Sequence, residues 1–114
     1  MEISNNSSPD PVQHQALASI PDEALLVPAM DQVSCGMDEN TVILNIKDGE
    51  YYELDPVGTQ AWNLLQETIV FGRLVERMLE EYEVGEAQLR EDLAELVAKL
   101  AQKGLVEIHG PQAA

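Results

Sequence analysis

Residue types that could perform catalysis are few in this chain, and they lie far apart. The two histidines, His14 and His109, stand near opposite ends, where solvated side chains are expected, and Cys35 has no histidine near it in sequence. A reactive cysteine needs a base or a cation beside it to lower the pKa of its thiol, so we expect Cys35 to be a buried structural thiol. No metal-ligand spacing and no glycine-rich phosphate loop occur. The sequence therefore predicts a protein that is not an enzyme and that holds no metal or cofactor.

Carboxylates are the only abundant ionisable groups. Twenty-one acidic residues face six basic ones, which gives a net charge of -15 at pH 7. They are densest in the runs EEYEVGE (80–86) and REDLAE (90–95). Nothing places a pair of them in an apolar pocket, as acid–base catalysis would require, so these runs are expected to be solvated faces. The alternative is a surface that steers a basic partner.

The charge also excludes two classes of partner. Nucleic-acid binding draws most of its affinity from Lys and Arg side chains that replace counterions, and this chain repels a phosphate backbone. Acidic membrane surfaces are disfavoured for the same reason. The chain has one cysteine, no signal-peptide pattern at its start and no apolar run of membrane-spanning length. These features predict a soluble, cytoplasmic protein.

Composition divides the 114 residues into a single domain with two tails. Residues 1–29 are rich in Pro, Ser, Asn and Asp and are predicted to be a flexible N-terminal tail. The end of this tail, ALLVP (24–28), is apolar enough to pack on the domain. Residues 30–109 carry the periodic patterns of the domain, and residues 110–114 are expected to be a frayed C-terminus.

The elements of the domain follow a simple order, with strands before helices. β-Branched and apolar residues predict three strands, over 32–37, 41–46 and 50–54. Asp48-Gly49 suits the tight turn between the last two, because glycine readily takes the positive φ that such a turn needs. In the third strand, alternation places Tyr52 and Leu54 on one face of the sheet and their neighbours on the other.

Three helices are predicted after the strands. Asp55 is a favoured helix N-cap, and Pro56 costs no hydrogen bond at the first helical position. Apolar residues at helical spacing then predict helices over 56–66, 70–82 and 86–103. Gly104 is a natural helix stop, and residues 105–108 form a last short strand. Strands grouped ahead of helices predict an α+β fold, in which a three-stranded antiparallel sheet is followed by three helices in a winged-helix-like arrangement.

A winged helix raises the alternative of a transcription regulator. Its recognition helix would be the third helix, which opens with Glu86, Glu91 and Asp92. Recognition helices bring basic or amide side chains to the base edges, so the electrostatics of this helix oppose DNA binding. Sequence-specific DNA binding therefore stays the less favoured alternative.

The third predicted strand has one side without a partner. Its neighbour on one side is the second strand, and no segment of the sequence is predicted to pair with the other side. A free sheet edge is either protected or used to bind an added strand. EYYEL (50–54) contains no proline that would block pairing, and Tyr51 and Tyr52 offer a large contact area. The alternative is a short edge protected by Glu50 and Glu53.

The run DGEYYELDPVGTQAWNLL (48–65) resembles the PqqD-like family of peptide-modification chaperones, also called RiPP recognition elements. It is most similar to the small stand-alone members found beside lasso-peptide proteases. The positions that carry the pattern are Gly49, Tyr51, Tyr52, Leu54, Asp55, Gly58, Trp62, Leu64 and Leu65. The resemblance continues to the closing strand and covers residues 32–108. Two positions depart from it: Ile69 stands where the family often has a capping Thr, and Gly72 is a costly residue within a helix.

The resemblance implies a chaperone without catalytic activity. The leader of a ribosomally made, post-translationally modified peptide would add as an antiparallel strand along residues 50–54, with apolar side chains in a groove beside the third helix. The chaperone would then present the precursor to a maturation enzyme, which is a leader protease in lasso-peptide systems and a radical SAM enzyme in others. The lasso-peptide type is favoured. Candidate leader-binding residues are Glu50, Tyr51, Tyr52, Glu53 and Leu54 on the strand and Leu89, Asp92, Leu93 and Leu96 on the third helix.

Three alternatives stay open at this stage. The leucines of the third helix could serve ordinary core packing instead. An edge strand that pairs with a leader could also pair with a second copy, which would give a homodimer. The chain could also be an adaptor that docks onto a maturation enzyme and has no affinity for peptide.

Overall fold

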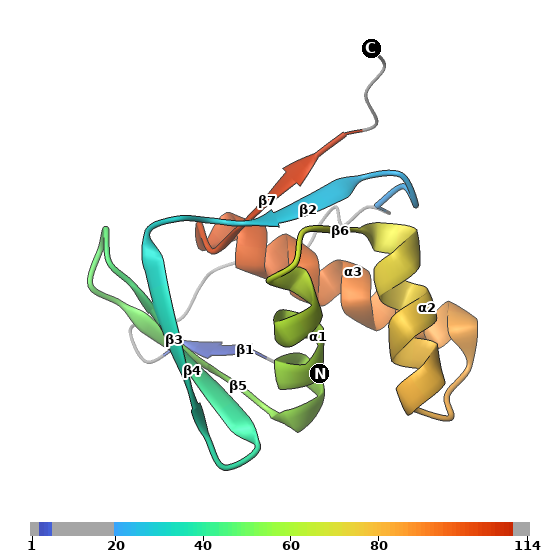
Figure 1. The fold of residues 1–114 in the computed structure, drawn as a ribbon, viewed down its shortest axis with the longest axis horizontal. Coiled ribbons are helices and arrows are strands. Elements are labelled where there is room, and N and C mark those ends of the chain that lie inside the picture. The colour runs from blue at the N-terminus through green and yellow to red at the C-terminus, as the bar shows by residue number, and fades with distance from the viewer. Residues whose placement is uncertain (1–2, 6–19, 111–114) are drawn as a thin grey trace.

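The computed structural model describes residues 3–5 and 20–110. Its strands are β1 (Ile3–Asn5), β2 (Leu25–Pro28), β3 (Gln32–Met37), β4 (Asn40–Asn45), β5 (Tyr51–Leu54), β6 (Ile69–Val70) and β7 (Val106–His109). Its helices are α1 (Pro56–Leu65), α2 (Phe71–Glu81) and α3 (Glu86–Gln102). The strands form two sheets, in the order β1-β5-β4-β3 and β6-β2-β7. Figure 1 shows α1 between the first sheet and α2.

The predicted fold class is confirmed. β3, β4 and β5 follow one another as an antiparallel sheet, and three helices follow them in a winged-helix-like arrangement. The register aligns Ser34 with Ile43 and Ile43 with Tyr52, so one row of side chains crosses all three strands on the face toward the core. Gly49 takes a positive φ of 76° in the turn before β5, as expected.

The helix α1 begins where the sequence predicts and carries the largest core side chain. The Asp55 carboxylate accepts a hydrogen bond from the Gly58 amide at 2.7 Å, which caps the helix. Trp62 is buried, and its indole Nε1 donates to the Ser34 hydroxyl on β3, 3.2 Å away. A buried N–H without an acceptor would be costly, so this pair helps to hold α1 against the sheet.

The helix α3 is tied to the hairpin that carries β5. Asn45 is buried at the end of β4, and its Nδ2 donates to the carbonyl oxygen of Lys103 at 2.9 Å. The last carbonyl groups of a helix have no partner within the helix, and this bond satisfies one just beyond the end of α3. It therefore sets the position of the β4–β5 hairpin relative to α3.

Residues 20–29 belong to the folded domain, although the sequence analysis placed them in the N-terminal tail. β2 is the central strand of the second sheet, with β6 on one side and β7 on the other. Ala24 and Leu26 have no exposed surface. The apolar run that was expected only to pack on the domain completes a sheet, because both of its edges find backbone partners. The domain therefore begins before residue 30.

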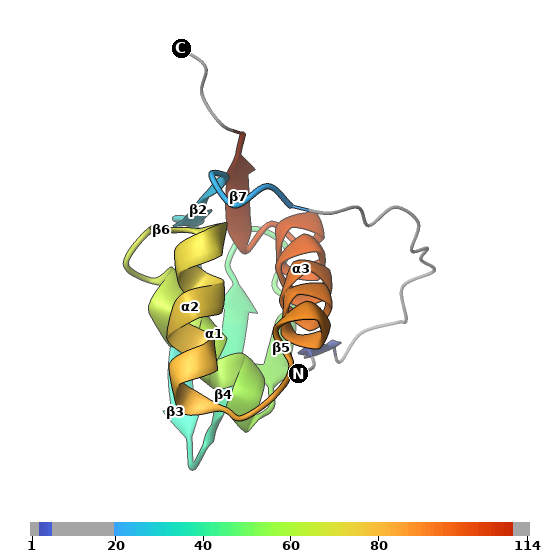
Figure 2. The ribbon, with the colours of Figure 1, turned by 90° about the vertical axis from the view of Figure 1, so that its right-hand side faces the viewer.

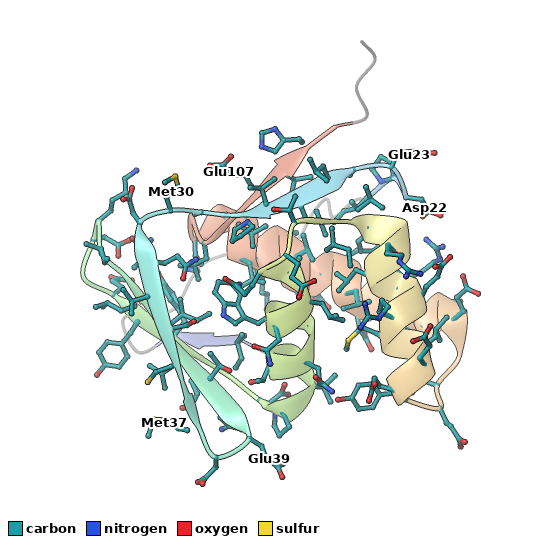
Figure 3. The ribbon with its side chains drawn as sticks, in the orientation of Figure 1. Asp22, Glu23, Met30, Met37, Glu39 and Glu107 are labelled. Carbon is teal, nitrogen blue, oxygen red and sulfur yellow. The ribbon has the colours of Figure 1, made fainter. Side chains whose placement is uncertain are left out.

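The start of α2 explains both departures from the family pattern. Within the described part of the chain, no side chain caps this helix. Instead the Phe71 amide donates to the Ala24 carbonyl at 2.9 Å, and the Gly72 amide donates to the Asp22 carbonyl at 3.0 Å. A β-carbon at position 72 would lie 3.0 Å from the Asp22 Cβ, so glycine permits this close approach. In Figure 3, Asp22 lies beside this end of α2. Backbone groups of the N-terminal segment thus replace a capping side chain.

Candidate functional site

The strand β5 has a neighbour on each side. β4 pairs with one edge, as predicted, and β1 pairs with the other. The register sets Ile3–Asn5 antiparallel to Tyr52–Leu54. The sequence predicts no partner for this edge, and in the structure the chain's own N-terminal segment fills it. Three residues with one β-branched side chain are too short a pattern to predict a strand, so the sequence carried no clear signal of this pairing.

The strand β1 touches a second element that the sequence analysis nominated, the helix α3. Figure 2 shows β1 beside β5 and near one end of α3. A strand added to this edge of β5 therefore contacts α3 as well.

The candidate residues of β5 divide between two faces, as alternation predicts. Tyr52 and Leu54 are buried toward the core, whereas Tyr51 and Glu53 are exposed on the opposite face. Glu50 is half-buried just before the strand, and its amide donates to the Asp48 carboxylate in the turn. The five candidates thus share the strand and its turn, but only two of their side chains are available on the open face.

The candidate residues of α3 are mostly core residues. Leu89, Leu93 and Leu96 are buried in the main apolar cluster. Asp92 is half-buried and accepts a hydrogen bond from Gln88 Nε2 at 3.0 Å. The structure brings these leucines together with the buried side of β5 and not with its exposed side chains.

The open face of the first sheet carries an apolar row that sequence reasoning missed. Val33, Leu44 and Tyr51 align across β3, β4 and β5, and all three are exposed. Alternation within the strands was the signal that could have found this row. Cys35 lies on the same face, opposite Val42, and is exposed. The expectation of a buried thiol is therefore wrong, because the alternation of side chains along β3 points Cys35 away from α1.

An exposed ion pair joins the N-terminal segment to α3. Arg90 donates from Nη1 and Nη2 to the Asp22 carboxylate, at 2.6 and 3.2 Å, and from Nε to Glu86 at 3.1 Å. The hydrogen bonds from Arg90 lower the pKa of Asp22, and those to Asp22 and Glu86 raise the pKa of Arg90. This pair helps to keep residues 20–24 on the domain.

The described residues, 3–5 and 20–110, also bear on metal binding and on membrane insertion. No cluster of three or more His, Cys, Asp or Glu side chains among them is arranged to hold a metal ion. None of their helices has the length and apolar character needed to cross a membrane.

The family comparison covers the elements on which this site rests. The family model described as Coenzyme PQQ synthesis protein D (PqqD) matches residues 40–106, which is more than half of the chain. The chain belongs to the PqqD family. This confirms the resemblance seen in the sequence. The match runs from β4 through β5 and the three helices to the first residue of β7, so β1, β2 and β3 lie outside it.

Two solved structures share the fold of this PqqD-family chain. One, described as "TbiB1 in Complex with the TbiA(beta) Leader Peptide", is 32% identical with a TM-score of 0.68, and the match covers 71% of this chain and 94% of that one. The other, "Lasso peptide synthetase B1 complexed with the leader peptide", is 22% identical with a TM-score of 0.65, covering 72% and 96%. At 22% identity the second likeness concerns the fold alone. No curated protein matches the chain.

Proposed function

We propose that this PqqD-family protein binds the leader of a ribosomally made, post-translationally modified peptide and presents the precursor to a maturation enzyme. It performs no catalysis itself. The observation that carries the proposal is the outer edge of β5, which takes an antiparallel strand in contact with α3. A solved relative with 32% identity is described in complex with a leader peptide.

The leader binds by strand addition. Main-chain hydrogen bonds along Tyr51–Leu54 supply affinity, and side chains on alternate faces of the leader supply specificity. On one face the leader side chains lie toward α3 and the core. On the other they lie beside Tyr51 and Glu53, where the exposed apolar row extends the contact area. Binding of this kind falls between micromolar and nanomolar dissociation constants, roughly -8 to -12 kcal/mol.

The proposed partner enzyme is a leader protease of the lasso-peptide type. The resemblance to stand-alone members beside lasso-peptide proteases favours it. A radical SAM enzyme is the alternative partner. We place the step in the cytoplasm, where ribosomes release the precursor.

A transcription regulator is the less favoured second function. Glu86, Glu91 and Glu95 are exposed on α3, the helix that would have to enter the major groove. Their charge repels the phosphate backbone.

Fluorescence anisotropy with the labelled leader of the precursor peptide encoded beside the gene tests the function. We expect saturable binding at micromolar concentration or below, and no response with a labelled DNA duplex. Tyr51→Ala is expected to weaken leader binding about tenfold or more, because an aromatic anchor at an interface carries a large share of the binding energy. Tyr51 is 49% exposed, so the fold should survive.

Val84→Ala is the matched control, since Val84 is also 49% exposed but lies between α2 and α3. It should leave leader affinity unchanged. Failure to bind the leader, with or without the neighbouring enzyme, would contradict the proposed function. Equal affinity of the Tyr51→Ala and Val84→Ala variants, with intact circular-dichroism spectra, would remove Tyr51 from the binding site.

A further inference from the structure

We infer that the N-terminal strand β1 is a built-in competitor of the leader: it covers the leader-binding edge of β5 in the free protein and must leave before a leader can bind there. This inference rests on the proposed function and adds a means of regulating the same edge. The pairing of Ile3–Asn5 with Tyr52–Leu54 is the observation that carries it.

The two strands cannot share the edge. A strand has two hydrogen-bonding edges, and β4 holds one edge of β5. The backbone groups on the other edge of Tyr52–Leu54 face β1. A leader that adds to β5 needs these same groups, and its path beside α3 is also occupied, because β1 contacts that helix. Occupation by β1 and by the leader is therefore mutually exclusive.

The competitor is held near the edge by the covalent chain. Residues 20–28 are fixed to the domain through the buried side chains of Ala24 and Leu26 and the two hydrogen bonds between Arg90 and Asp22. Residues 6–19 join this fixed point to β1. A chain of that length reaches roughly 45–50 Å when extended, which exceeds the largest extent of the molecule, 34 Å. This covalent link makes the pairing of β1 with β5 intramolecular, so the pairing does not depend on protein concentration.

The contact is short enough to be displaced. Only three residues of β1 pair with β5, and short strand pairings are marginal in water without further support. The apparent affinity of a ligand falls in proportion to the fraction of protein whose site is open. If β1 covers the edge in about nine of ten molecules, the leader binds about tenfold more weakly than to an open edge.

The family match covers the edge but not the strand β1 that occupies it. The family match begins at residue 40, so it includes β5 and α3 but not β1. The edge that β1 covers therefore lies within the family match, whereas β1 itself lies before it.

The test uses the full chain with Ser4→Pro/Asn5→Pro. Successive residues of a strand point their backbone N–H groups to opposite edges, so only one of Ser4 and Asn5 can donate to β5. Two adjacent prolines remove both N–H groups and therefore remove that donor in either case. The control variant, Gln13→Pro/His14→Pro, carries the same two-proline change outside β1. Leader affinity is measured by anisotropy, and hydrogen exchange of the Tyr51–Leu54 amides is measured without leader.

We expect the Ser4→Pro/Asn5→Pro variant to bind leader about tenfold more tightly and to exchange its β5 amides faster, with the control matching the unaltered protein. Equal leader affinity of all three proteins would overturn the competition and leave the proposed function standing. Absence of leader binding by all three would overturn the proposed function and the competition together. In that case the exchange data would still report whether β1 covers β5. If the protection of the β5 amides from hydrogen exchange rose with protein concentration, the strand that covers β5 would come from a second copy. That result would overturn the internal competitor.

Discussion

At the scale of single residues, Leu93 and Tyr51 lie in opposite environments, one in the core and the other on the open face of the first sheet. Both were nominated for peptide contact, yet Leu93 has no exposed surface and belongs to the same buried cluster as Trp62. Helical spacing reports which face of a helix turns inward, but it does not distinguish a core from a groove. Tyr51 remains a candidate for contact with the peptide, because the alternation of side chains along β5 turns it outward.

Leu93→Ala is therefore expected to lower the free energy of unfolding by about 2–5 kcal/mol, since it removes packed methyl groups and leaves a cavity. Tyr51→Ala is a surface substitution and should change it by roughly 0.5 kcal/mol or less. Urea denaturation of the two variants measures both values. If Leu93→Ala unfolded at the same urea concentration as the unaltered protein and lost only leader affinity, Leu93 would be a binding residue and its assignment to the core would be wrong.

At the scale of elements, the N-terminal segment and α2 depend on each other. The first amides of α2 donate to the Ala24 and Asp22 carbonyls, so the start of the helix and the residues just before β2 hold each other in place. Gly72 makes this contact possible, since an added β-carbon would lie within 3.3 Å of three Asp22 side-chain atoms. The glycine that looked costly within a helix is explained by its neighbour from fifty residues earlier in the chain.

Gly72→Ala is expected to destabilise the protein by about 1–3 kcal/mol, the usual cost of overpacking. In an Asp22→Gly background the same change should cost little, because the crowding atoms are gone. Gly36→Ala is the control, as its added β-carbon would meet only the Asn40 carbonyl oxygen at 4.0 Å. Thermal unfolding of Gly72→Ala, Asp22→Gly, the double variant and Gly36→Ala measures the energetic coupling between positions 22 and 72. An equal cost of Gly72→Ala with and without Asp22 would mean that crowding by Asp22 is not the reason for the glycine.

At the scale of the whole molecule, the ion pair between Asp22 and Arg90 joins the N-terminal segment to α3. The pKa of Asp22 is lowered in the folded protein, chiefly by the hydrogen bonds from Arg90. A lowered folded-state pKa means that the ionised carboxylate stabilises the fold at pH values above about 3.9, the pKa of an unperturbed aspartate. This stabilisation is lost as the pH falls through the lowered value.

Asp22→Asn is accordingly expected to lower the Tm at pH 7 by at most a few degrees, since exposed ion pairs are weak, and to lower it progressively less as the pH falls toward 2. The same pH series with Glu91→Gln, a substitution at an exposed residue of α3, corrects for the change in total charge. Thermal melts between pH 2 and pH 7 give the comparison. A destabilisation by Asp22→Asn that stayed constant over this range would show that the carboxylate charge does not contribute.

The sequence by itself determined most of the fold. The periods of the apolar residues, the Asp55-Pro56 helix start and the Gly49 turn specified three strands and three helices, because these signals act within a few residues of the chain. The motif around Tyr51 and Trp62 indicated the family. Alternation also assigned the two faces of β5 correctly, since side chains in any strand point to opposite sides in turn.

Only the tertiary structure decided what covers the edges and faces of these elements. The pairing of Ile3–Asn5 with β5, the central place of β2 in a second sheet, and the burial of Leu93 all depend on groups distant in sequence. Short strands gain their stability from such partners and carry little signal of their own. The sequence therefore defined the strand that can bind a peptide, and the three-dimensional packing decided that the chain's own N-terminus lies on it.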